Sequence, residues 1–325
     1  MDRRAFIGMI ASGALAAPTA ARAQPAGRMY RIGVLDAVPA AQNVANLDAL
    51  RRGLREAGYV EGRNLIIEYR SADGRAERFV ELVDELVRLP VDLIVTRGTP
   101  AAMAAQRATE SIPVVIATMG DPRALVTSFA RPGGNVTGVT TFSTELTGKR
   151  VQLLKELVPT LARVGLLHNM GNPAVPPEWE ETRRSARAQG LEATLLDVRT
   201  PADLGRAFEL AARQRVDAVV VGADGLTQAH LQAIVELAGR HRLPAAYPAR
   251  EFVEAGGLVA YAVNYPDLYF RFARYADRIF KGAKPGDLPV EQPSKFELVV
   301  NLKTAKELGI VVPQAVLLRA DEVIK

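Results

Sequence analysis

Residues 92–106, DLIVTRGTPAAMAAQ, contain the pattern that decides the fold, because a run of apolar residues passes directly into a helical segment. The run is short and rich in branched apolar residues, which is typical of a buried strand. The Thr-Arg-Gly-Thr junction, residues 96–99, holds no Cys, His or carboxylate, so it offers hydrogen-bond donors and little catalytic chemistry. Open α/β folds hold ligands at such turns, at the carboxyl ends of buried strands.

The same succession of strand and helix surrounds this stretch on both sides. Apolar segments bounded by turn residues predict strands over residues 30–36, 64–72, 91–96 and 112–118. Segments with apolar residues at helical spacing predict helices over residues 43–58, 76–89 and 100–111. Alternating strands and helices indicate a parallel sheet that is covered by helices on both faces.

A cluster of Pro and Gly in residues 130–142, ARPGGNVTGVTTF, interrupts this succession and is typical of a turn or a crossing between domains. The alternation of strand and helix then begins again. Strands are expected over residues 163–169, 191–198, 216–224 and 243–249, and helices over residues 145–161, 176–190, 200–214 and 227–242. The chain therefore contains two α/β units of similar size in tandem.

Two further segments, residues 256–282 and 296–310, remain after both units are complete. We therefore expect the chain to return between the domains near Asn264 and again near residue 290. The predicted fold is α/β, with two doubly wound parallel-sheet domains joined by a multi-crossing hinge and a ligand cleft between the sheets. The expected domains are residues 24–141 with 264–290, and residues 142–263 with 291–325.

The composition of the chain is that of a folded protein, with 325 residues of which 48% are hydrophobic and 24% charged. The formal net charge is +5, but Lys and Arg are interleaved with Asp and Glu, which favours solvated helix faces over a nucleic-acid surface. Cysteine is absent, which excludes disulfides, thiolate metal sites, a cysteine nucleophile and an acylated cysteine.

The first 23 residues, MDRRAFIGMIASGALAAPTAARA, have the parts of a signal peptide. An arginine pair is followed by an apolar run over residues 5–17, which is too short to span a bilayer, and by a small-x-small sequence at residues 21–23. The motif RRAFIG also resembles a twin-arginine export signal, so twin-arginine export and general secretion both remain open. We expect cleavage after Ala23 and a soluble periplasmic protein.

The sequence contains little that could carry out catalysis, so we predict a protein that is not an enzyme and that needs no cofactor. Two of the three histidines, His230 and His241, lie in a predicted surface helix, where we expect them to be solvated. His168 ends a predicted strand, but no second histidine lies near it to complete a metal site. The glycine-rich phosphate loops and the serine elbow of hydrolases are also missing.

Binding chemistry is concentrated in the turn of the opening stretch. We expect Thr99 to be the N-cap and Pro100 the first residue of the helix that follows. The free N–H groups and partial positive charge of this helix end suit a carboxylate or a phosphate, and the hydroxyls of Thr96 and Thr99 would complete the site. Thr99 either contacts the ligand or only caps its own helix, and the two roles are compatible.

Polar residues at neighbouring strand ends extend this predicted site. Thr118 adds a hydroxyl and Asp121 a carboxylate after the next strand, while Asp36 ends the first strand. A carboxylate beside a carboxylate-binding helix end indicates a ligand that also carries an ammonium group or hydroxyls, as an amino acid does. Asp121 could instead cap the helix that follows it, and Asp36 has the same two possible roles.

Four residues at strand ends of the second unit are also predicted to bind the ligand: Asn169, Asp224, Tyr247 and Tyr261. The two tyrosines can stack on an apolar or ring-bearing ligand and orient it with their hydroxyls. The expected ligand is therefore a small carboxylate-bearing molecule that is partly aromatic or apolar.

Three blocks of the sequence resemble one family. DPRALVTSFARPGGNVTGVTTF (residues 121–142), LPAAYPAREFVEAGGLVAYA (243–262) and residues 274–324, which include KGAKPGDLPVEQP, are similar to ABC-transporter substrate-binding proteins of the tryptophan/tyrosine-type family. The resemblance covers nearly all of the chain after the signal peptide. It implies the type I periplasmic binding fold and a receptor that closes like a hinge and delivers its ligand to a membrane permease.

The resemblance also bears on the predicted site. It implies that the loop with Thr96 and Thr99 and the strand end with Thr118 hold the ligand carboxylate. The family usually has a glycine after the tyrosine of GGLVAYA, where this chain has Ala262, so the backbone beside Tyr261 is expected to lie differently. By the same comparison, the residues on cleft-facing loops are Asp121, Asn169, Asp224 and Tyr261.

Together these observations predict an exported, monomeric solute-binding receptor of an ABC uptake transporter. Its expected partners are a small-molecule ligand and, transiently, an ABC permease in the inner membrane, with no nucleic acid and no metal. Two alternatives remain open from the sequence: a ligand sensor for a membrane receptor, and an enzyme on the same scaffold with Asp121 or Asp224 as the base.

Overall fold

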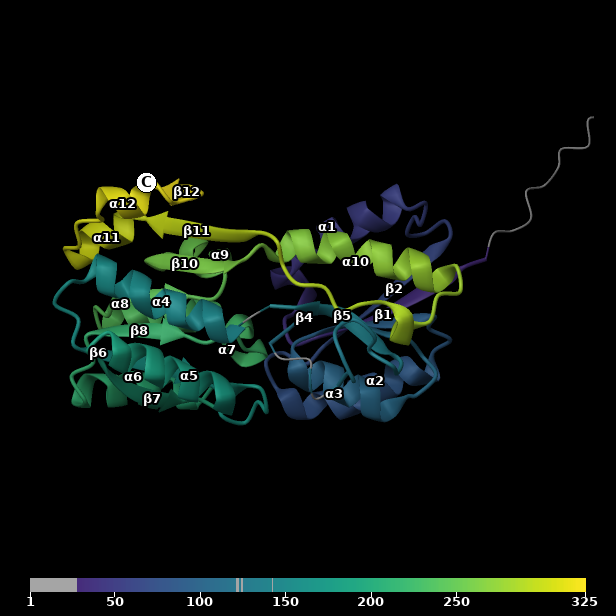
Figure 1. The fold of residues 1–325 in the computed structure, drawn as a ribbon, viewed down its shortest axis with the longest axis horizontal. Helices are drawn as coiled ribbons and strands as arrows, with labels where there is room; N and C mark the ends of the chain where they lie inside the picture. Colours follow the sequence, from purple (N-terminus) through teal and green to yellow (C-terminus); the bar gives the residue numbers. More distant parts are fainter. Residues whose placement is uncertain (1–27, 121–122, 124, 142) are drawn as a thin grey trace, which may run out of the picture.

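A computed structural model of the protein describes residues 28–120, 123, 125–141 and 143–325. The predicted signal peptide, residues 1–23, lies outside these residues. Two sheets lie end to end along the long axis of the molecule in Figure 1, and each forms the centre of one lobe. Within the described ranges, no helix combines the length and the apolar character needed to cross a membrane.

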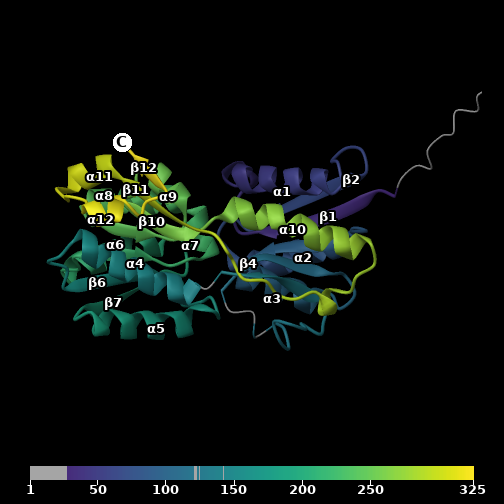
Figure 2. The ribbon, with the colours of Figure 1, turned by 45° about the horizontal axis from the view of Figure 1, so that its top comes forward.

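The first lobe is built on a parallel five-stranded sheet with the strand order β2-β1-β3-β4-β5. Its strands are β1 (Tyr30–Asp36), β2 (Leu65–Ser71), β3 (Leu93–Arg97), β4 (Val114–Met119) and β5 (Val136–Thr140). Its α-helices are α1 (Val44–Glu56), α2 (Phe79–Arg88), α3 (Thr99–Ala108) and α10 (Tyr265–Phe280). Helices α2 and α3 pack together on one face of the sheet, and α1 and α10 pack together on the other (Figure 2).

The second lobe is built on a seven-stranded sheet with the strand order β12-β11-β10-β9-β8-β6-β7. Its strands are β6 (Arg163–His168), β7 (Glu192–Asp197), β8 (Ala218–Val221), β9 (Ala245–Tyr247), β10 (Val259–Val263), β11 (Phe296–Asn301) and β12 (Glu322–Ile324). Its α-helices are α4 (Ser143–Leu157), α5 (Val175–Ala188), α6 (Asp203–Arg213), α7 (Gly225–Ala229), α8 (Leu231–Arg240), α9 (Arg250–Glu254), α11 (Leu302–Leu308) and α12 (Gln314–Leu317). Short 3₁₀ helices cover Ala40–Gln42, Ala76–Arg78 and Pro285–Asp287.

The predicted α/β fold with two parallel-sheet domains is confirmed. One pair of strands differs from the expected pattern, because β10 and β11 are antiparallel. The apolar strands expected from the sequence are buried on both sides, as the neighbouring pairs Val34 and Leu35 of β1 and Ile94 and Val95 of β3 show. This burial follows from the layering, since a parallel sheet is covered by helices on both faces.

The helix expected over residues 227–242 is two helices, which corrects the prediction. His230 lies between α7 and α8 with φ −115° and ψ 27°, outside the helical region. His230 is half-buried and not fully solvated as expected, and its Nε2 is buried with no hydrogen-bond partner among the described residues. Burial lowers the pKa of His230.

The chain passes between the lobes near Thr141, at Asn264 and again before β11. Asn264 follows β10 and is the N-cap of α10. After α10 the chain returns along the first sheet, where the N–H of Thr140 donates to the carbonyl of Glu291 at 3.0 Å. It then enters the second sheet at Phe296. Figure 1 shows this return segment running from the end of α10 to β11.

Helix α10 comes from late in the chain, yet it packs closely on α1. Gly53 of α1 allows this approach, because a methyl group there would lie 2.5 Å from the carbonyl oxygen of Phe270 and 2.9 Å from Cβ of Ala273. The close packing of these two helices holds the late segment against the first sheet.

We expect Gly53→Ala to lower the free energy of unfolding by about 1–3 kcal/mol, because the added methyl group forces the two helices apart. Urea denaturation followed by circular dichroism measures the change. The control is Gly205→Ala in α6, where a methyl group meets no atom within 4 Å and should stabilise the helix by up to about 1 kcal/mol. Equal stabilities of the two variants would contradict the close approach of α1 and α10.

Candidate functional site

A cavity lies between the two lobes, where strands of both sheets end. Residues following β1, β3 and β4 line it from the first lobe, and residues following β6 and β8 line it from the second. The cavity holds about 780 Å³ of space free of atoms, part of it open to solvent, which suits a small molecule. Carboxyl ends of parallel strands are where open α/β sheets bind ligands, so this cavity is the candidate site.

Asp36 lies at the end of β1, lines the cavity and is fully buried. Its Oδ1 accepts a hydrogen bond from the N–H of Val38 at 2.9 Å. Its Oδ2 accepts one from Asn43 Nδ2 at 2.9 Å and one from the hydroxyl of Tyr269 at 2.8 Å. These three bonds hold the carboxylate in place at the floor of the site.

Arg97 is a cleft residue that the sequence analysis missed. It lines the cavity, its guanidinium carbon lies 4.6 Å from the centroid of the Tyr265 ring, and its Nη1 donates to Asn43 Oδ1 at 3.4 Å. Burial alone would lower the pKa of Arg97, but attraction to Asp36 and its other neighbours outweighs burial and raises the pKa above its ordinary value. The side chain is therefore a fixed cation in the cleft.

The three predicted threonines are all buried, and two of them line the cavity. Thr99 and Thr118 lie on its wall, and both are less than 6% exposed. Thr96 lies one residue before the lining segment, and its buried Oγ1 has no hydrogen-bond partner among the described residues. The third hydroxyl is thus close to the site without being part of its surface.

The expected N-cap of α3 is wrong by one residue. Gly98 is the N-cap, with φ 84° and ψ 157°, and Thr99 is the first helical residue. Glycine is required there because a side chain is strained at this positive φ. No side chain of the described residues caps the helix. The N–H of Gly98 donates to the carbonyl of Thr118 at 2.7 Å and Pro100 has no N–H, so the N–H groups of Thr99 and Ala101 are the ones at the start of α3 that suit an anion. Asp121, the other predicted residue of this wall, lies outside the described residues.

The second lobe contributes Asn169 and Asp224, as predicted from the sequence, and both line the cavity. Asp224 accepts hydrogen bonds from Asn169 Nδ2 at 3.1 Å and from Asn172 Nδ2 at 2.8 Å. It also caps α7 by accepting from the N–H of Leu226 at 2.9 Å. These bonds fix the two asparagine side chains on the cavity wall.

Glu178 is a second cleft residue that the sequence analysis missed, because it is one of several acidic residues in an amphipathic helix. It lines the cavity, is 2% exposed, and its Oε1 accepts from the hydroxyl of Thr147 at 2.5 Å. Behind it, Arg150 donates to Thr147 Oγ1 at 3.1 Å and to the carbonyl of Tyr261 at 2.9 Å. Burial lowers the pKa of Arg150.

Gln228 of α7 is a third residue without a signal in the sequence. It lines the cavity and is 6% exposed. Its Nε2 is buried and has no hydrogen-bond partner within the described part of the chain. A buried amide donor that lacks a partner is costly, so this atom is well suited to bond a ligand acceptor.

The structure places Tyr247 and Tyr261 away from the cavity, which corrects their expected position. Tyr247 is 1% exposed and stacks on Phe252 in the core of the second lobe, with ring centroids 5.0 Å apart. Tyr261 lies in the middle of β10 and stacks on Phe296 at 6.3 Å, beside a different surface pocket. The tyrosine that lines the cleft is Tyr265, where the chain has left the strand.

The two lobes are in contact beside the cavity. A methyl group on Gly225 of the second lobe would lie 2.5 Å from Cβ of Ala37 in the first. A methyl group on Gly74 of the first lobe would lie 3.0 Å from Nε2 of His230 in the second. His168, by contrast, is buried beneath the site and does not line the cavity, and burial lowers its pKa.

The chain that forms this cleft is similar to a known protein family and to a named relative. A family model described as ABC transporter substrate binding protein matches residues 31–324. A tyrosine-binding protein of Clostridioides difficile strain R20291 is 25% identical over 271 residues, which are 82% of this chain and 78% of that protein.

Two solved structures are also similar. A conserved domain protein of Vibrio cholerae is 28% identical, with a TM-score of 0.85, and the match covers 91% of this chain and 100% of that one. An ABC domain from Streptococcus pneumonia in complex with L-Trp is 30% identical, with a TM-score of 0.83 and the same coverage of 91% and 100%.

We expect Gln228→Leu to raise the free energy of unfolding of the ligand-free protein by up to about 2 kcal/mol, because it removes a buried donor that has no partner. Urea denaturation measures the difference. Gln152→Leu is the matched control, since Gln152 is exposed on α4 and its replacement should change stability by less than about 0.5 kcal/mol. A loss of stability in Gln228→Leu would show that the amide is satisfied within the protein.

Proposed function

The chain belongs to the ABC transporter substrate-binding proteins, and from this premise we propose that it captures a small amino-acid-like ligand between its two lobes. Members of this family bind small molecules and work with ABC permeases. The observation that carries the proposal is the pairing of charges across one cavity. Arg97 and the start of α3 lie on the first lobe, and buried Glu178 lies on the second.

In this proposal the first lobe binds the ligand carboxylate. The guanidinium of Arg97 supplies a fixed positive charge, the N–H groups at the start of α3 supply donors, and the hydroxyls of Thr99 and Thr118 lie on the same wall. Asp121, which the sequence placed at the same strand end as Thr118, stays a proposed contact.

The second lobe binds the ligand ammonium group in the same proposal. Glu178 lines the cavity as a carboxylate, and the amides of Asn169 and Asn172, whose Nδ2 groups donate to Asp224, lie on the wall next to it. Gln228 supplies the donor for a further ligand acceptor. A ring or apolar group of the ligand contacts Phe79 and Tyr265, which also line the cavity. The relatives that are named for tyrosine and that hold L-Trp support an aromatic amino acid as the first candidate.

Capture requires the lobes to open and close, and we propose that they do so about the segments at Thr141, Asn264 and Glu291–Phe296. The proposed rigid bodies are residues 24–141 with 264–290, and residues 142–263 with 291–325. A ligand that bonds both walls stabilises the arrangement in which the lobes touch. We further propose that the protein is exported, acts in the periplasm as a monomer, and docks transiently on its permease.

A thermal-shift screen of the protein expressed from Gln24 tests the ligand class. We expect L-tryptophan or L-tyrosine at 100 times its dissociation constant to add about 2.7 kcal/mol to stability, which is a shift of several degrees. Tryptamine, which lacks the carboxylate, and 3-indolepropionate, which lacks the ammonium group, are the matched controls and should give no shift at the same concentration. Shifts with sugars alone, or equal shifts with tryptamine, would overturn the proposed ligand class.

Gly225→Ala tests closure. Because the added methyl group would lie 2.5 Å from Cβ of Ala37, the variant cannot bring the lobes together and should bind the ligand from the screen at least about 10-fold more weakly. Isothermal titration calorimetry measures the affinity. Gly239→Ala on α8, where a methyl group meets no atom within 4 Å, should bind like the unaltered protein. Undiminished affinity in Gly225→Ala would show that capture does not need this contact.

A further inference from the structure

We infer that Glu297 is a positioning residue for ligand capture, which holds the first turn of α10, and with it Tyr265 and Arg97, in the orientation that the cleft requires. The inference rests on the proposed function, because it assigns a role to a residue that lies outside the cavity. Glu297 reaches the cleft through Asn264, the residue at which the chain leaves the second lobe.

The two chain segments that join the lobes at this place lie side by side. Strand β10 leads out of the second lobe and β11 leads back into it, and Val263 is paired with Phe296 in the antiparallel ladder. The N–H of Asn264 donates to the carbonyl of Lys295 at 3.3 Å. A rotation of one lobe against the other therefore changes the backbone at Asn264 and Lys295 together.

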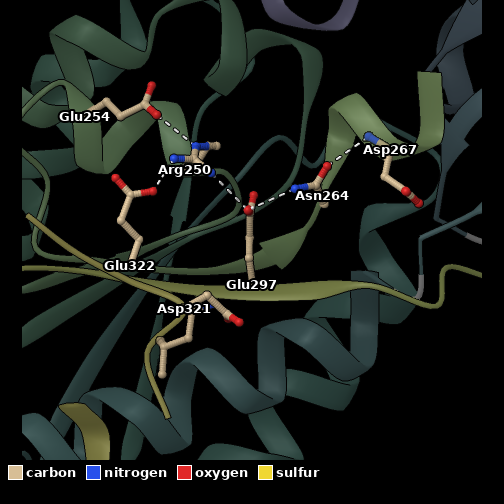
Figure 3. Close-up of polar contacts among 8 residues, drawn as sticks. Arg250, Glu254, Asn264, Asp267, Glu297, Asp321 and Glu322 are labelled. Atoms are coloured by element: carbon tan, nitrogen blue, oxygen red, sulfur yellow. Dashed lines mark hydrogen bonds and ion pairs between the residues drawn. The ribbon is translucent and has the colours of Figure 1, made fainter. Parts of the chain in front are cut away.

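Glu297 connects this hinge to the body of the second lobe (Figure 3). Its Oε2 accepts from Asn264 Nδ2 at 3.2 Å and from Arg250 Nη1 at 3.2 Å. Arg250, on α9, is held in turn by Glu254 at 2.8 Å and by Glu322. The Glu297 side chain is only 9% exposed, so its bonds are poorly screened by water.

Asn264 uses both ends of its side-chain amide. Its Oδ1 accepts from the N–H of Asp267 at 2.8 Å and so caps α10, while its Nδ2 donates to Glu297. The amide cannot rotate without breaking one of these bonds. The start of α10, a helix of the first lobe, is therefore oriented by a carboxylate of the second lobe.

The residue after Asn264 is part of the candidate site. Tyr265 is 6% exposed and its ring supports the Arg97 guanidinium at 4.6 Å. Both residues line the cavity. Glu297 is thus connected to the proposed anion site in three steps. It accepts a hydrogen bond from Asn264, Asn264 is joined to Tyr265 by a peptide bond, and the Tyr265 ring makes a cation–π contact with Arg97.

Burial raises the pKa of Glu297, and Arg250 and Asn264 act against this effect. A carboxylate at this position is therefore costly to bury without its two partners. A second link, the ion pair of Lys295 with Asp267 at 2.7 Å, is exposed at Lys295 and is weaker for that reason.

The test uses two variants that remove the hydrogen bond between Asn264 and Glu297, one at its donor and one at its acceptor. Asn264→Ser keeps a side-chain oxygen that can cap α10 but removes the donor to Glu297, and Glu297→Met removes the acceptor. Glu254→Gln is the control, because Glu254 also pairs with Arg250 but does not contact Asn264. Glu297→Gln keeps an acceptor for Asn264 and should restore the behaviour of the unaltered protein.

Two readouts separate positioning from stability. The chain has no cysteine of its own, so nitroxide labels at Val80→Cys and Arg199→Cys, two exposed positions on opposite lobes, report the distance between the lobes by electron double resonance. Calorimetric titration with L-tryptophan reports affinity.

We expect Asn264→Ser and Glu297→Met to broaden the distance distribution and to weaken L-tryptophan binding at least 10-fold, and Glu254→Gln to change affinity less than 2-fold. Unchanged distances and affinity in the first two variants, with only a lower melting temperature, would overturn the inference. If the unaltered protein does not bind L-tryptophan, the proposed ligand class fails, and the distance distributions alone then decide the role of Glu297.

Discussion

The buried carboxylate of Asp36 is the interaction on which the arrangement of the cleft depends. It accepts hydrogen bonds from Asn43 at the start of α1 and from Tyr269 of α10, and it attracts Arg97 at the end of β3. One carboxyl group therefore joins elements that are up to 233 residues apart in the chain. Removing the carboxylate would leave the half-buried Arg97 cation without its main attracting charge, which is more costly than losing an apolar contact.

The position of α10 connects this ion cluster to the rest of the molecule. The helix begins at Asn264, packs on α1 through Gly53, and carries both Tyr265 and Tyr269. Because the chain enters it directly from β10 of the second lobe, the orientation of α10 couples the crossing between the lobes to the cavity wall of the first lobe. The same helix thus serves packing, the cavity wall and the connection between the lobes.

The cleft contains both polar groups that have hydrogen-bond partners within the protein and polar groups that have none among the described residues. Asp36 and Asp224 have hydrogen-bond partners within the protein, which keep the walls rigid. Gln228, in contrast, presents a buried amide donor that lacks a partner in the described chain. A site arranged in this way is preorganised on most of its surface and gains free energy where the ligand supplies the missing acceptor.

Much of the architecture could be read from the sequence. Hydrophobic periodicity and turn residues act over short distances, so the α/β class, the two sheets and most of the strands and helices were correctly predicted. The strands β5 and β12 and the break between α7 and α8 were not predicted. The same local reasoning failed where a single backbone φ angle decides which residue is the N-cap of a helix. Gly98 is the N-cap of α3, the position that was expected for Thr99. It also failed for Tyr261, since its place within β10 depends on where the strand ends.

What the sequence by itself determined was the fold class and the edge of each sheet at which a ligand can bind, because both follow from the period of the apolar residues and the direction of parallel strands. Only the tertiary structure decided that Arg97 and Glu178 face the cavity. In the sequence they resemble the many solvated charges of helix and strand ends, but in the structure Arg97 is half-buried and Glu178 is buried. Burial and counter-charge come from residues far away in the chain, and no local pattern encodes them.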